Sequence, residues 1–502
     1  MASDGWSTIA PLAPAGDSNS FSNSNNHSIH ADHDPGADDE RPPPFRPEEV
    51  DLEAEEQLKI DQGINFDRFD RIEVDCRGAD IKPVDRFSDL ISSDLLLANI
   101  DKAGYKKMTP IQRYTIPALA QGYDLVGCAQ TGSGKTAAFL LPVLQTILNE
   151  RDLDMQYGQE CQKPHCIIIA PTRELAKQTY VEALKLSRDS VVKCQYIYGG
   201  IQTGYLRAQI SKGTHVLVST PGRLKDFIER NWISLERIKY IILDEGDRLI
   251  DDGFVTDMRV LFSHPSMPPK DQRQTMFFSA TFKPDAQQLA KEFMKPNYLF
   301  ITVGMVGAAN EDVKQEFLRV ERPEKKRELK KILVNLGSED RVIVFTQTKA
   351  TADIISGFLS SSGISCTSIH GDRHQSQREQ ALSEFKRGTK KCLVASPVGE
   401  RGLDLPKVSM VINYDMPNEL DEYIHRIGRT GRIGNVGRAI SFFDPDRDTR
   451  LINELTRALK QAQQPVPDFF SNTSYNPESN DAFADNSEDM VGDSGQAEVE
   501  SW

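Results

Sequence analysis

Short apolar runs alternate along most of the chain with longer stretches in which apolar residues recur at helical spacing. Many of the runs are rich in β-branched residues, which is typical of strands buried on both faces of a parallel sheet. In the first half they lie at 124–129, 166–170, 215–220, 240–245 and 275–280. In the second half they lie at 341–346, 366–371, 391–396, 408–414 and 439–443. The pattern predicts an α/β protein with two parallel-sheet domains in tandem, whose strands are connected by crossover helices.

The two ends of the chain differ in composition from this body. Roughly the first 48 residues are rich in Ser, Asn, Asp and Pro, and the stretch from Ser471 onward is similar. Such segments cannot bury enough apolar surface to offset the entropy lost on ordering. We predict disordered acidic tails at 1–56 and 471–502, a first domain at 57–303, a glycine-containing linker at 304–313 and a second domain at 314–470.

Charge is distributed unevenly along the chain. The formal net charge is -14, of which residues 1–56 carry -11 and residues 471–502 carry -8, which leaves +5 on the body. A mildly basic body between acidic tails is compatible with an RNA-binding groove. The seven cysteines are scattered, and no apolar run approaches the roughly 20 residues that span a bilayer. We therefore expect reduced thiols, a cytosolic or nuclear location and no membrane association.

The stretch AQTGSGKT (129–136) follows a predicted strand and precedes an apolar helix, the context that a phosphate-binding loop requires. Gly132 and Gly134 would let backbone N–H groups turn toward phosphates, and the helix N-terminus favours an anion. Lys135 would reach the β- and γ-phosphates, and Thr136 would offer its hydroxyl to Mg²⁺. The alternative is a turn rich in glycine and serine, which the flanking strand and helix disfavour.

The stretch ILDEGDRLIDDGF ends an apolar strand in three acids. Asp244 lies at the carboxyl end of a predicted parallel strand, where open α/β sheets bind ligands, and it could hold Mg²⁺. Glu245 beside it could orient an attacking water as a general base. The alternative is a solvated acidic turn at a strand end. Relative to alanine, Gly246 between the acids costs about 1 kcal/mol in backbone entropy on folding. We therefore expect it to loosen the loop without disabling it.

Nine motifs, of which the first precedes the phosphate-binding loop and the others follow it, occur in a fixed order along the chain. They are GYKKMTPIQ (104–112), PTRELAKQ (171–178), GG (199–200), TPGRL (220–224), DEGD (244–247), SAT (279–281), HGDRHQSQR (370–378), RGLD (401–404) and HRIGRTGR (425–432). Together with the phosphate-binding loop, this set resembles the DEAD-box RNA helicases over roughly residues 80–445. The stretches GINFDRFDRIEVDCRG and VINYDMPNELDEYIHRIGRTGR are most similar to the Vasa branch of that family.

The resemblance implies two RecA-like domains that bind ATP and Mg²⁺ between them. Nucleotide-binding residues would be Phe87, Thr109 and Gln112 of an adenine-reading segment at 85–113, the loop residues Ala129, Gln130, Thr131, Gly132, Ser133, Gly134, Lys135 and Thr136, and Asp404 at the ribose. Catalytic residues would be Lys135, Thr136, Asp244, Glu245, Ser279, Thr281, and Arg429 and Arg432 as arginine fingers. Thr136 and Asp244 would hold the metal, and Asp247 would bond to Ser279 and Thr281.

The resemblance also implies a groove for single-stranded RNA, gripped through phosphate and sugar without reading sequence. Its residues would be Pro171, Thr172, Arg173, Gly200, Thr220, Gly222 and Arg223 in the first domain and Thr346, Gly371 and Arg378 in the second. Because ATP and RNA would each bind across the cleft, their binding would be cooperative and closure would separate a short duplex locally.

The expected function is that of a monomeric, cytoplasmic, Vasa-like RNA helicase in germ-cell translational control or small-RNA pathways, located in perinuclear germ granules with germ-granule and translation-initiation proteins as partners. A second hypothesis is an ATP-gated RNA clamp with weak turnover. It is motivated by Pro397, which has no N–H, and by Glu400, whose charge would oppose phosphates. A third, a DNA translocase, leaves the Phe87 and Gln112 pair and HRIGRTGR unexplained.

Overall fold

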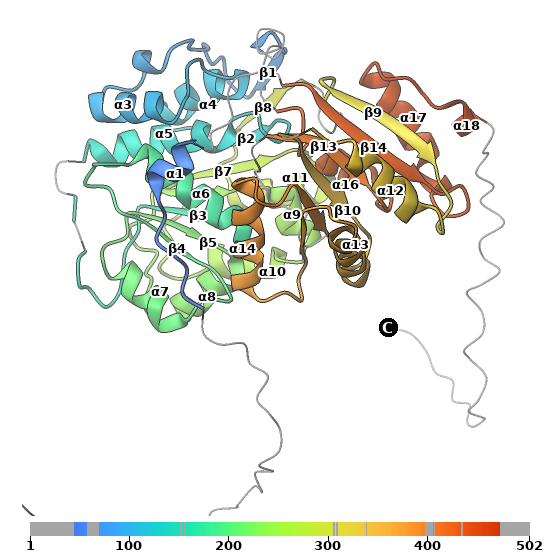
Figure 1. Cartoon of the computed structure of the whole chain (residues 1–502). Coiled ribbons are helices and arrows are strands. Elements are labelled where there is room, and N and C mark those ends of the chain that lie inside the picture. The colour runs from blue at the N-terminus through green and yellow to red at the C-terminus, as the bar shows by residue number, and fades with distance from the viewer. Residues whose placement is uncertain are drawn as a thin grey trace, which may run out of the picture. The chain divides into compact units, whose positions relative to one another are not determined.

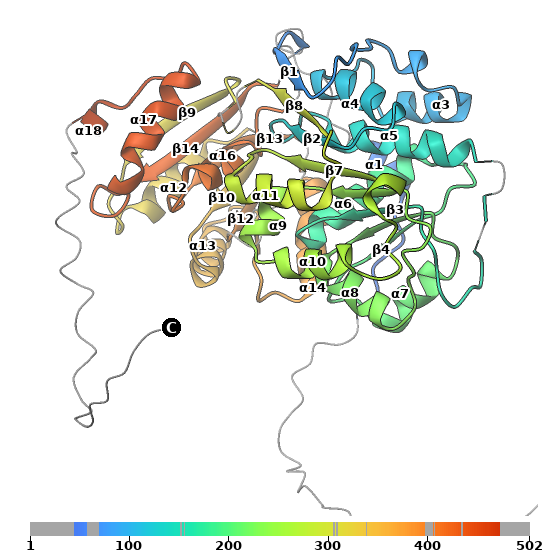
Figure 2. The same cartoon turned by 180° about the vertical axis from the view of Figure 1, so that it is seen from behind.

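The computed structural model describes residues 45–57, 70–150, 153–154, 156–304, 307, 310–337, 339–396, 405, 407–432 and 435–471. Two separate sheets account for all of the strands in these ranges. Figures 1 and 2 show the chain from opposite sides, with each sheet lying between helices. The predicted α/β fold with two parallel-sheet, RecA-like domains is confirmed.

The first sheet has eight strands in the order β1-β8-β2-β7-β6-β3-β5-β4. All neighbours are parallel except the edge strand β1, which is antiparallel to β8. Their bounds are β1 (Val74–Arg77), β2 (Leu125–Cys128), β3 (Cys166–Ile169), β4 (Cys194–Ile197), β5 (Val216–Ser219), β6 (Tyr240–Leu243), β7 (Gln274–Ser279) and β8 (Leu299–Val303).

Helices flank this sheet on both faces, with α4, α5 and α6 on one side and α9, α10 and α11 on the other (Figures 1 and 2). The helical elements are α1 (Leu52–Gln57), η1 (Phe87–Asp89), α3 (Asp94–Lys102), α4 (Pro110–Ala120), α5 (Lys135–Leu148), α6 (Arg173–Leu186), α7 (Thr203–Ile210), α8 (Pro221–Glu229), α9 (Gly246–Asp251), α10 (Val255–Phe262), η2 (Lys270–Gln272) and α11 (Pro284–Phe293). The strands of the sheet interior are buried on both faces because helices cover both.

The second sheet has six parallel strands in the order β11-β12-β10-β13-β14-β9. Its strands are β9 (Val313–Arg319), β10 (Arg341–Phe345), β11 (Cys366–Ile369), β12 (Cys392–Ala395), β13 (Val408–Asn413) and β14 (Gly437–Phe443). The helical elements around it are α12 (Lys325–Val334), α13 (Lys349–Ser361), α14 (Gln375–Lys386), α16 (Leu420–Ile427), η3 (Thr449–Leu451), α17 (Ile452–Gln461) and α18 (Asp468–Ser471).

Each of the ten apolar runs overlaps one strand of these sheets, and four strands were not predicted. The edge strands β1 and β9 alternate partly buried or buried positions with exposed ones, so neither forms a continuous apolar run. Strand β4 is interrupted by Gln195, and β8 is apolar except for Thr302, so that its length and composition could have identified it.

Part of the predicted N-terminal tail packs on the first domain. Phe45 forms a parallel bridge with Ile201, and its carbonyl accepts a hydrogen bond of 3.1 Å from the Gln202 N–H. Glu56 in α1 pairs with Arg188 at 3.0 Å. Residues 1–44 and 472–502 lie outside the described residues, as do 305–306 and 308–309 of the predicted linker. Within the described part of the chain no helix is long and apolar enough to cross a membrane.

Candidate nucleotide and nucleic-acid site

The phosphate-binding loop lies between β2 and α5, as its sequence context predicts. Gly132 and Gly134 have φ angles of 75° and 88°, in the left-handed region that glycine adopts without strain. Lys135, the first residue of α5, is buried, and its ammonium donates to the carbonyls of Ala129 at 2.5 Å and Ser279 at 3.3 Å. Burial lowers the pKa of Lys135, while the nearby acids act to raise it. The loop therefore holds a buried lysine at the carboxyl edge of the sheet.

A second feature of this loop is a polar atom with no partner. Ser133 is 2% exposed, and its hydroxyl makes no hydrogen bond within the described residues. Buried hydroxyls are normally paired, because an unmade hydrogen bond costs free energy. A glycine-rich loop at a helix N-terminus, with a buried lysine and a buried hydroxyl, has the groups that bind the phosphates of a nucleotide.

The acids follow β6, which is separated from β2 in the sheet by β7 alone. Burial raises the pKa of Asp244 to about 7, and Glu245 adds to the rise while Lys135 opposes it. Glu245 has a φ of 49°, and its Oε2 lies 3.4 Å from Nε of Arg248 but makes no hydrogen bond within the described residues. The carboxylate of Asp244 and the hydroxyl of Thr136 are oxygen donors of the kind that Mg²⁺ uses together with phosphate oxygens, so the chemistry of both residues fits the ion.

Asp247 links the acidic loop to the SAT segment. Its Oδ2 accepts hydrogen bonds from the Thr281 N–H at 3.2 Å and the Thr281 hydroxyl at 2.8 Å. Burial acts to raise the pKa of Asp247, but His425, Arg248 and the hydroxyls of Ser279 and Thr281 outweigh it, and the net pKa is lowered. Asp247 is therefore an anion that holds the end of β7 to the start of α9.

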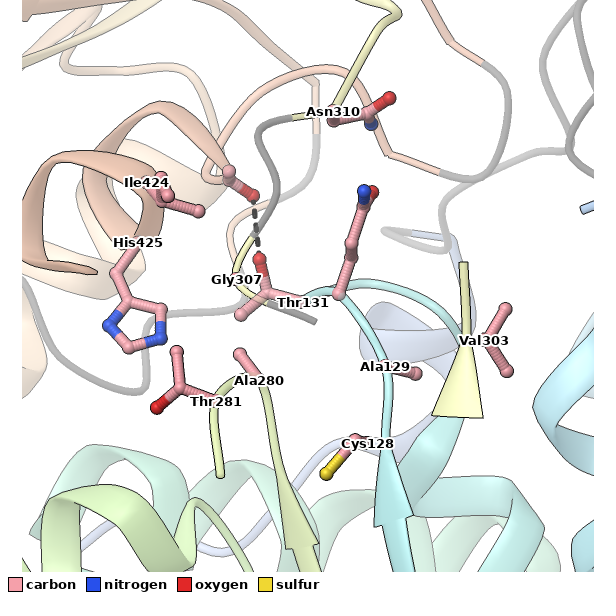
Figure 3. Close-up of a pocket in the computed structure, with 12 residues that line it drawn as sticks. Cys128, Ala129, Thr131, Ala280, Thr281, Val303, Gly307, Asn310, Ile424 and His425 are labelled. Carbon is pink, nitrogen blue, oxygen red and sulfur yellow. Dashed lines mark hydrogen bonds between the residues drawn. The ribbon is translucent and has the colours of Figure 1, made fainter. Parts of the chain in front are cut away.

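The second domain meets this site through α16 and the turn after it. Nε2 of His425 lies 3.8 Å from Oδ2 of Asp247, and burial lowers the pKa of His425 well below its usual value. The Thr131 hydroxyl donates to the Gly428 carbonyl at 3.2 Å. Figure 3 shows Thr131 reaching toward this turn, with His425 and Thr281 facing each other beside it. The phosphate-binding loop and α16 thus contact each other directly.

Both predicted arginine fingers are buried. A Cβ built on Gly132 would lie 2.9 Å from Cγ of Arg432, so the arginine stem packs on the phosphate-binding loop itself. Nε of Arg429 donates to the His425 carbonyl at 3.1 Å. A glycine is required at 132 for this close approach as well as for its φ angle.

The adenine-reading segment is tied to the same loop. Gln112 in α4 is fully buried, its Oε1 accepts from the Thr109 N–H at 2.9 Å, and its Nε2 donates to the Gly134 carbonyl at 3.1 Å. Phe87 is mostly buried and meets Tyr105 edge-on at 6.5 Å between ring centroids. The adenine-reading segment is therefore in direct contact with the phosphate-binding loop.

The first-domain residues expected to bind RNA gather where three neighbouring parallel strands end. Thr172 caps α6 and accepts from the Leu175 N–H at 3.2 Å, and Thr220 stands at the N-cap of α8. Gly200 has a φ of 89°, and Gly222 has open space around it. Pro171 is buried before α6, and Arg223 is paired with Asp226 at 3.0 Å. Several helix N-termini at one edge are suited to bind phosphates.

The second-domain residues expected to bind RNA have different environments. Thr346 is fully buried, and its hydroxyl donates to the Thr348 carbonyl at 3.2 Å, whereas Gly371 is exposed. Arg378 pairs with Glu174 of α6 at 2.7 Å, and both side chains are buried. Asp404, Pro397 and Glu400 lie outside the described residues.

Helix α14 makes further contacts with the first domain that the sequence did not suggest. Arg173 donates to Oε1 of Gln375 at 3.2 Å, the Tyr198 hydroxyl donates to Glu379 at 2.9 Å, and Lys177 pairs with Glu379. The signal was present in the spacing of Gln375, Arg378 and Glu379, because positions i, i+3 and i+4 share one helix face. This face joins the predicted RNA-binding segment of one domain to the other domain.

The ion pair between Glu174 and Arg378 gives a direct test of this contact between α14 and the first domain. Removing one partner of a buried ion pair leaves the other charge buried without compensation, which typically costs about 3–5 kcal/mol. We expect Glu174→Gln to weaken closure, seen as a higher RNA concentration for half-maximal ATPase stimulation. Glu316→Gln, which breaks the surface pair with Arg438, is the control and should change nothing.

The charge-swapped double variant, Glu174→Arg with Arg378→Glu, separates two roles. If the ion pair holds the two domains together, the swap recovers part of the RNA-stimulated ATPase activity that either single change loses. No recovery would mean that Arg378 acts on RNA rather than on Glu174.

Comparisons with known proteins agree with this geometry. Residues 109–289 match the DEAD/DEAH box helicase model, and residues 324–434 match the helicase conserved C-terminal domain. The probable ATP-dependent RNA helicase DDX4 of Homo sapiens is 50% identical over 427 residues, which cover 85% of this chain and 58% of that relative. The ATP-dependent RNA helicase vasa of Drosophila melanogaster is 46% identical over 411 residues, covering 82% of this chain and 61% of that relative. The chain thus spans about three-fifths of the length of these curated relatives.

Two solved structures are similar to the chain over most of both domains. Dbp5 of S. cerevisiae, bound to RNA and ADP BeF3, gives a TM-score of 0.63 at 30% identity, covering 76% of this chain and 94% of that chain. Mss116p bound to ssRNA and AMP-PNP gives a TM-score of 0.66 at 28% identity, covering 77% and 78%. With both domain models matched in order around one buried site, the chain belongs to the DEAD/DEAH box helicase family.

Proposed function

We propose that the chain is an ATP-dependent RNA helicase that binds single-stranded RNA without sequence preference and opens short duplexes locally. The observation that carries this proposal is the contact of Arg432 and Gly428 with the phosphate-binding loop. A site that is complete only when two domains meet can make hydrolysis depend on closure, and closure can depend on RNA. The two structural relatives, which were solved with RNA and a nucleotide analogue bound, support the same ligands.

In the proposed reaction the first domain binds ATP. Backbone N–H groups of the loop, Lys135 and the unpaired Ser133 hydroxyl would hold the phosphates, and Thr136 and Asp244 would hold Mg²⁺. When bound, the ion neutralises charge on the phosphates. Glu245 would accept the proton of the attacking water, because its Oε2 makes no hydrogen bond within the described residues.

The second domain would complete the reaction. Arg429 and Arg432 would stabilise the charge that develops on the γ-phosphate, a contribution of roughly 10³–10⁵ in rate. Asp247 is bonded to Thr281 on one side and lies near His425 of the second domain on the other. It would therefore couple closure of the two domains to the position of the acidic loop. RNA phosphates would lie at the N-termini of α6, α7 and α8, whose dipoles favour anions.

The test of this function is strand separation. A blunt RNA duplex of about ten base pairs and one with a single-stranded extension would be mixed with the protein and ATP, and released strand would be counted. A helicase releases strand with ATP and not with a non-hydrolysable analogue. An ATP-gated clamp, the alternative, binds RNA equally well with the analogue and releases no strand.

Adenine selection gives a further prediction. We propose that Phe87 stacks on the adenine and that Gln112 bonds to its edge. Gln112→Ala and Phe87→Ala should each reduce the preference for ATP over GTP, by roughly tenfold for the lost amide contacts. The measurement is kcat/KM for both nucleotides, with Gln145→Ala, a buried glutamine of α5, as the matched control. Unchanged discrimination in both variants would place adenine recognition elsewhere.

The cellular role is proposed from the similarity to DDX4 and vasa. We propose a cytoplasmic, germ-cell protein concentrated in perinuclear granules, which acts as a monomer with germ-granule and translation-initiation proteins in translational control or small-RNA pathways. Fluorescence of a tagged full-length chain in germ cells tests the location. An even distribution through somatic and germ cells would contradict this role.

A further inference from the structure

The glycine between the catalytic acids is in close contact with an aromatic ring. A Cβ built on Gly246 would lie 2.4 Å from Cζ of Phe277, 2.6 Å from Cε1 and 2.7 Å from Cε2. Real Cβ atoms do not approach other heavy atoms so closely. Gly246 has no positive φ angle, so its backbone would accept any residue. The three heavy atoms nearest to such a Cβ all belong to this ring, so it is the ring that a side chain at 246 would meet first.

The ring has little room to withdraw. Phe277 is 1% exposed in the middle of β7, where it is paired with Leu243 of β6 on one side and Val126 of β2 on the other. Phe282 packs edge-on against it, with 5.9 Å between ring centroids. Interiors are close-packed, so moving a ring held on several sides displaces its neighbours.

The contact lies between the groups that the reaction needs. Glu245 precedes Gly246 and has a φ of 49°, and Asp247 follows it and is bonded to Thr281. Leu243, the strand neighbour of Phe277, directly precedes Asp244. The first turn of α9 is thus held on β7 at two points, one polar through Asp247 and one apolar through the ring.

We propose that Phe277 is a positioning residue, which packs on the bare Cα of Gly246 and thereby sets the place of Glu245 and Asp247. The two residues form a size-matched pair, in which the ring fills the volume that a methyl at 246 would occupy. We expected from the sequence that Gly246 merely loosens the loop. The packing leads to a different expectation: alanine at 246, which is the third residue of the Asp-Glu-Ala-Asp motif that gives the DEAD-box family its name, is harmful in this chain. The kinetic part of this inference rests on the proposed ATPase function.

A double-mutant cycle tests the pair, with Gly246→Ala, Phe277→Leu and both changes together. Gly246→Ala should overpack the contact and lower the melting temperature by roughly 2–8 °C. It should also lower kcat for ATP at least tenfold, while KM for ATP changes less than about threefold, because Lys135 and the phosphate-binding loop are untouched. Phe277→Leu makes room for the methyl, so the double variant should recover kcat to within about threefold of the parent.

The control is Gly357→Ala in α13, where a Cβ has nothing within 4 Å. It measures the general effect of alanine on a helical glycine and should leave kcat unchanged and stability equal or higher. The melting temperature needs no ATPase activity, so it tests the packing even if the proposed function fails.

Two results would overturn the inference. One is a Gly246→Ala variant with the parent's kcat and melting temperature, which would mean that the ring moves freely. The other is a folded double variant no more active than Gly246→Ala, which would mean that the ring does not set the position of the acids.

Discussion

Glu245→Gln is expected to retain ATP and RNA binding and to lose nearly all turnover. The substitution keeps the shape of the side chain and removes the anionic oxygen that would accept the water's proton. General-base catalysis contributes roughly 10²–10⁴ in rate, so kcat should fall by about that factor. Single-turnover hydrolysis of radiolabelled ATP, together with equilibrium binding of a fluorescent nucleotide, separates the two effects.

One structural explanation must be separated from this chemical one. Glu245 lies 3.4 Å from the buried Arg248, so the variant also weakens an ion pair. Thermal unfolding of the variant distinguishes the two, because a lost ion pair lowers the melting temperature and a lost base does not. Glu236→Gln, which breaks a surface pair with Lys163, is the control. Turnover at the parent rate would remove Glu245 from its proposed role.

Arg432→Ala is expected to have a similarly large effect from the other domain. Arginine fingers contribute roughly 10³–10⁵ to kcat, and the stem of Arg432 already packs on Gly132 in the phosphate-binding loop. RNA-stimulated turnover should fall at least a thousandfold, while the first domain still binds ATP. Arg432→Lys should recover only a small part, because an ammonium cannot reproduce the planar, two-pronged contact with a phosphate.

Arg438→Ala is the matched control for this prediction. Arg438 lies six residues further along, half-exposed, and pairs with Glu316 on the surface. It should leave turnover within twofold of the parent. If Arg432→Ala also stays within that range, the finger is Arg429 or the contact with the phosphate-binding loop plays no part in hydrolysis.

The sequence predicted those parts of the fold and site that depend on contiguous residues. The phosphate-binding loop could be placed because a glycine-rich turn between a strand and a helix is defined by its neighbours. The acids after β6 could be placed because the carboxyl ends of parallel strands meet at one edge. Edge strands such as β9 were missed, because only one of their faces is covered and the apolar run is broken.

Other parts depend on residues that meet only after folding. The packing of Phe277 on Gly246 joins positions 31 residues apart on different elements, and neither residue type alone signals it. The pair of Glu174 with Arg378 spans 204 residues and two domains. Arg378 looked like an RNA ligand because it is an arginine in the right motif, and only the structure places a buried acid beside it.

The most direct test of the account is the coupling between ATP and RNA, measured in both directions on the unmodified chain. ATP turnover would be followed with and without a single-stranded RNA of about ten nucleotides. RNA affinity would be measured with and without a non-hydrolysable ATP analogue, and the affinity for the analogue with and without RNA. Linkage requires that the analogue raise RNA affinity by the factor by which RNA raises analogue affinity. We predict a factor of at least ten in each direction and turnover stimulated to the same degree or more. Turnover and affinity that are each indifferent to the other ligand would contradict the closure on which the whole site depends.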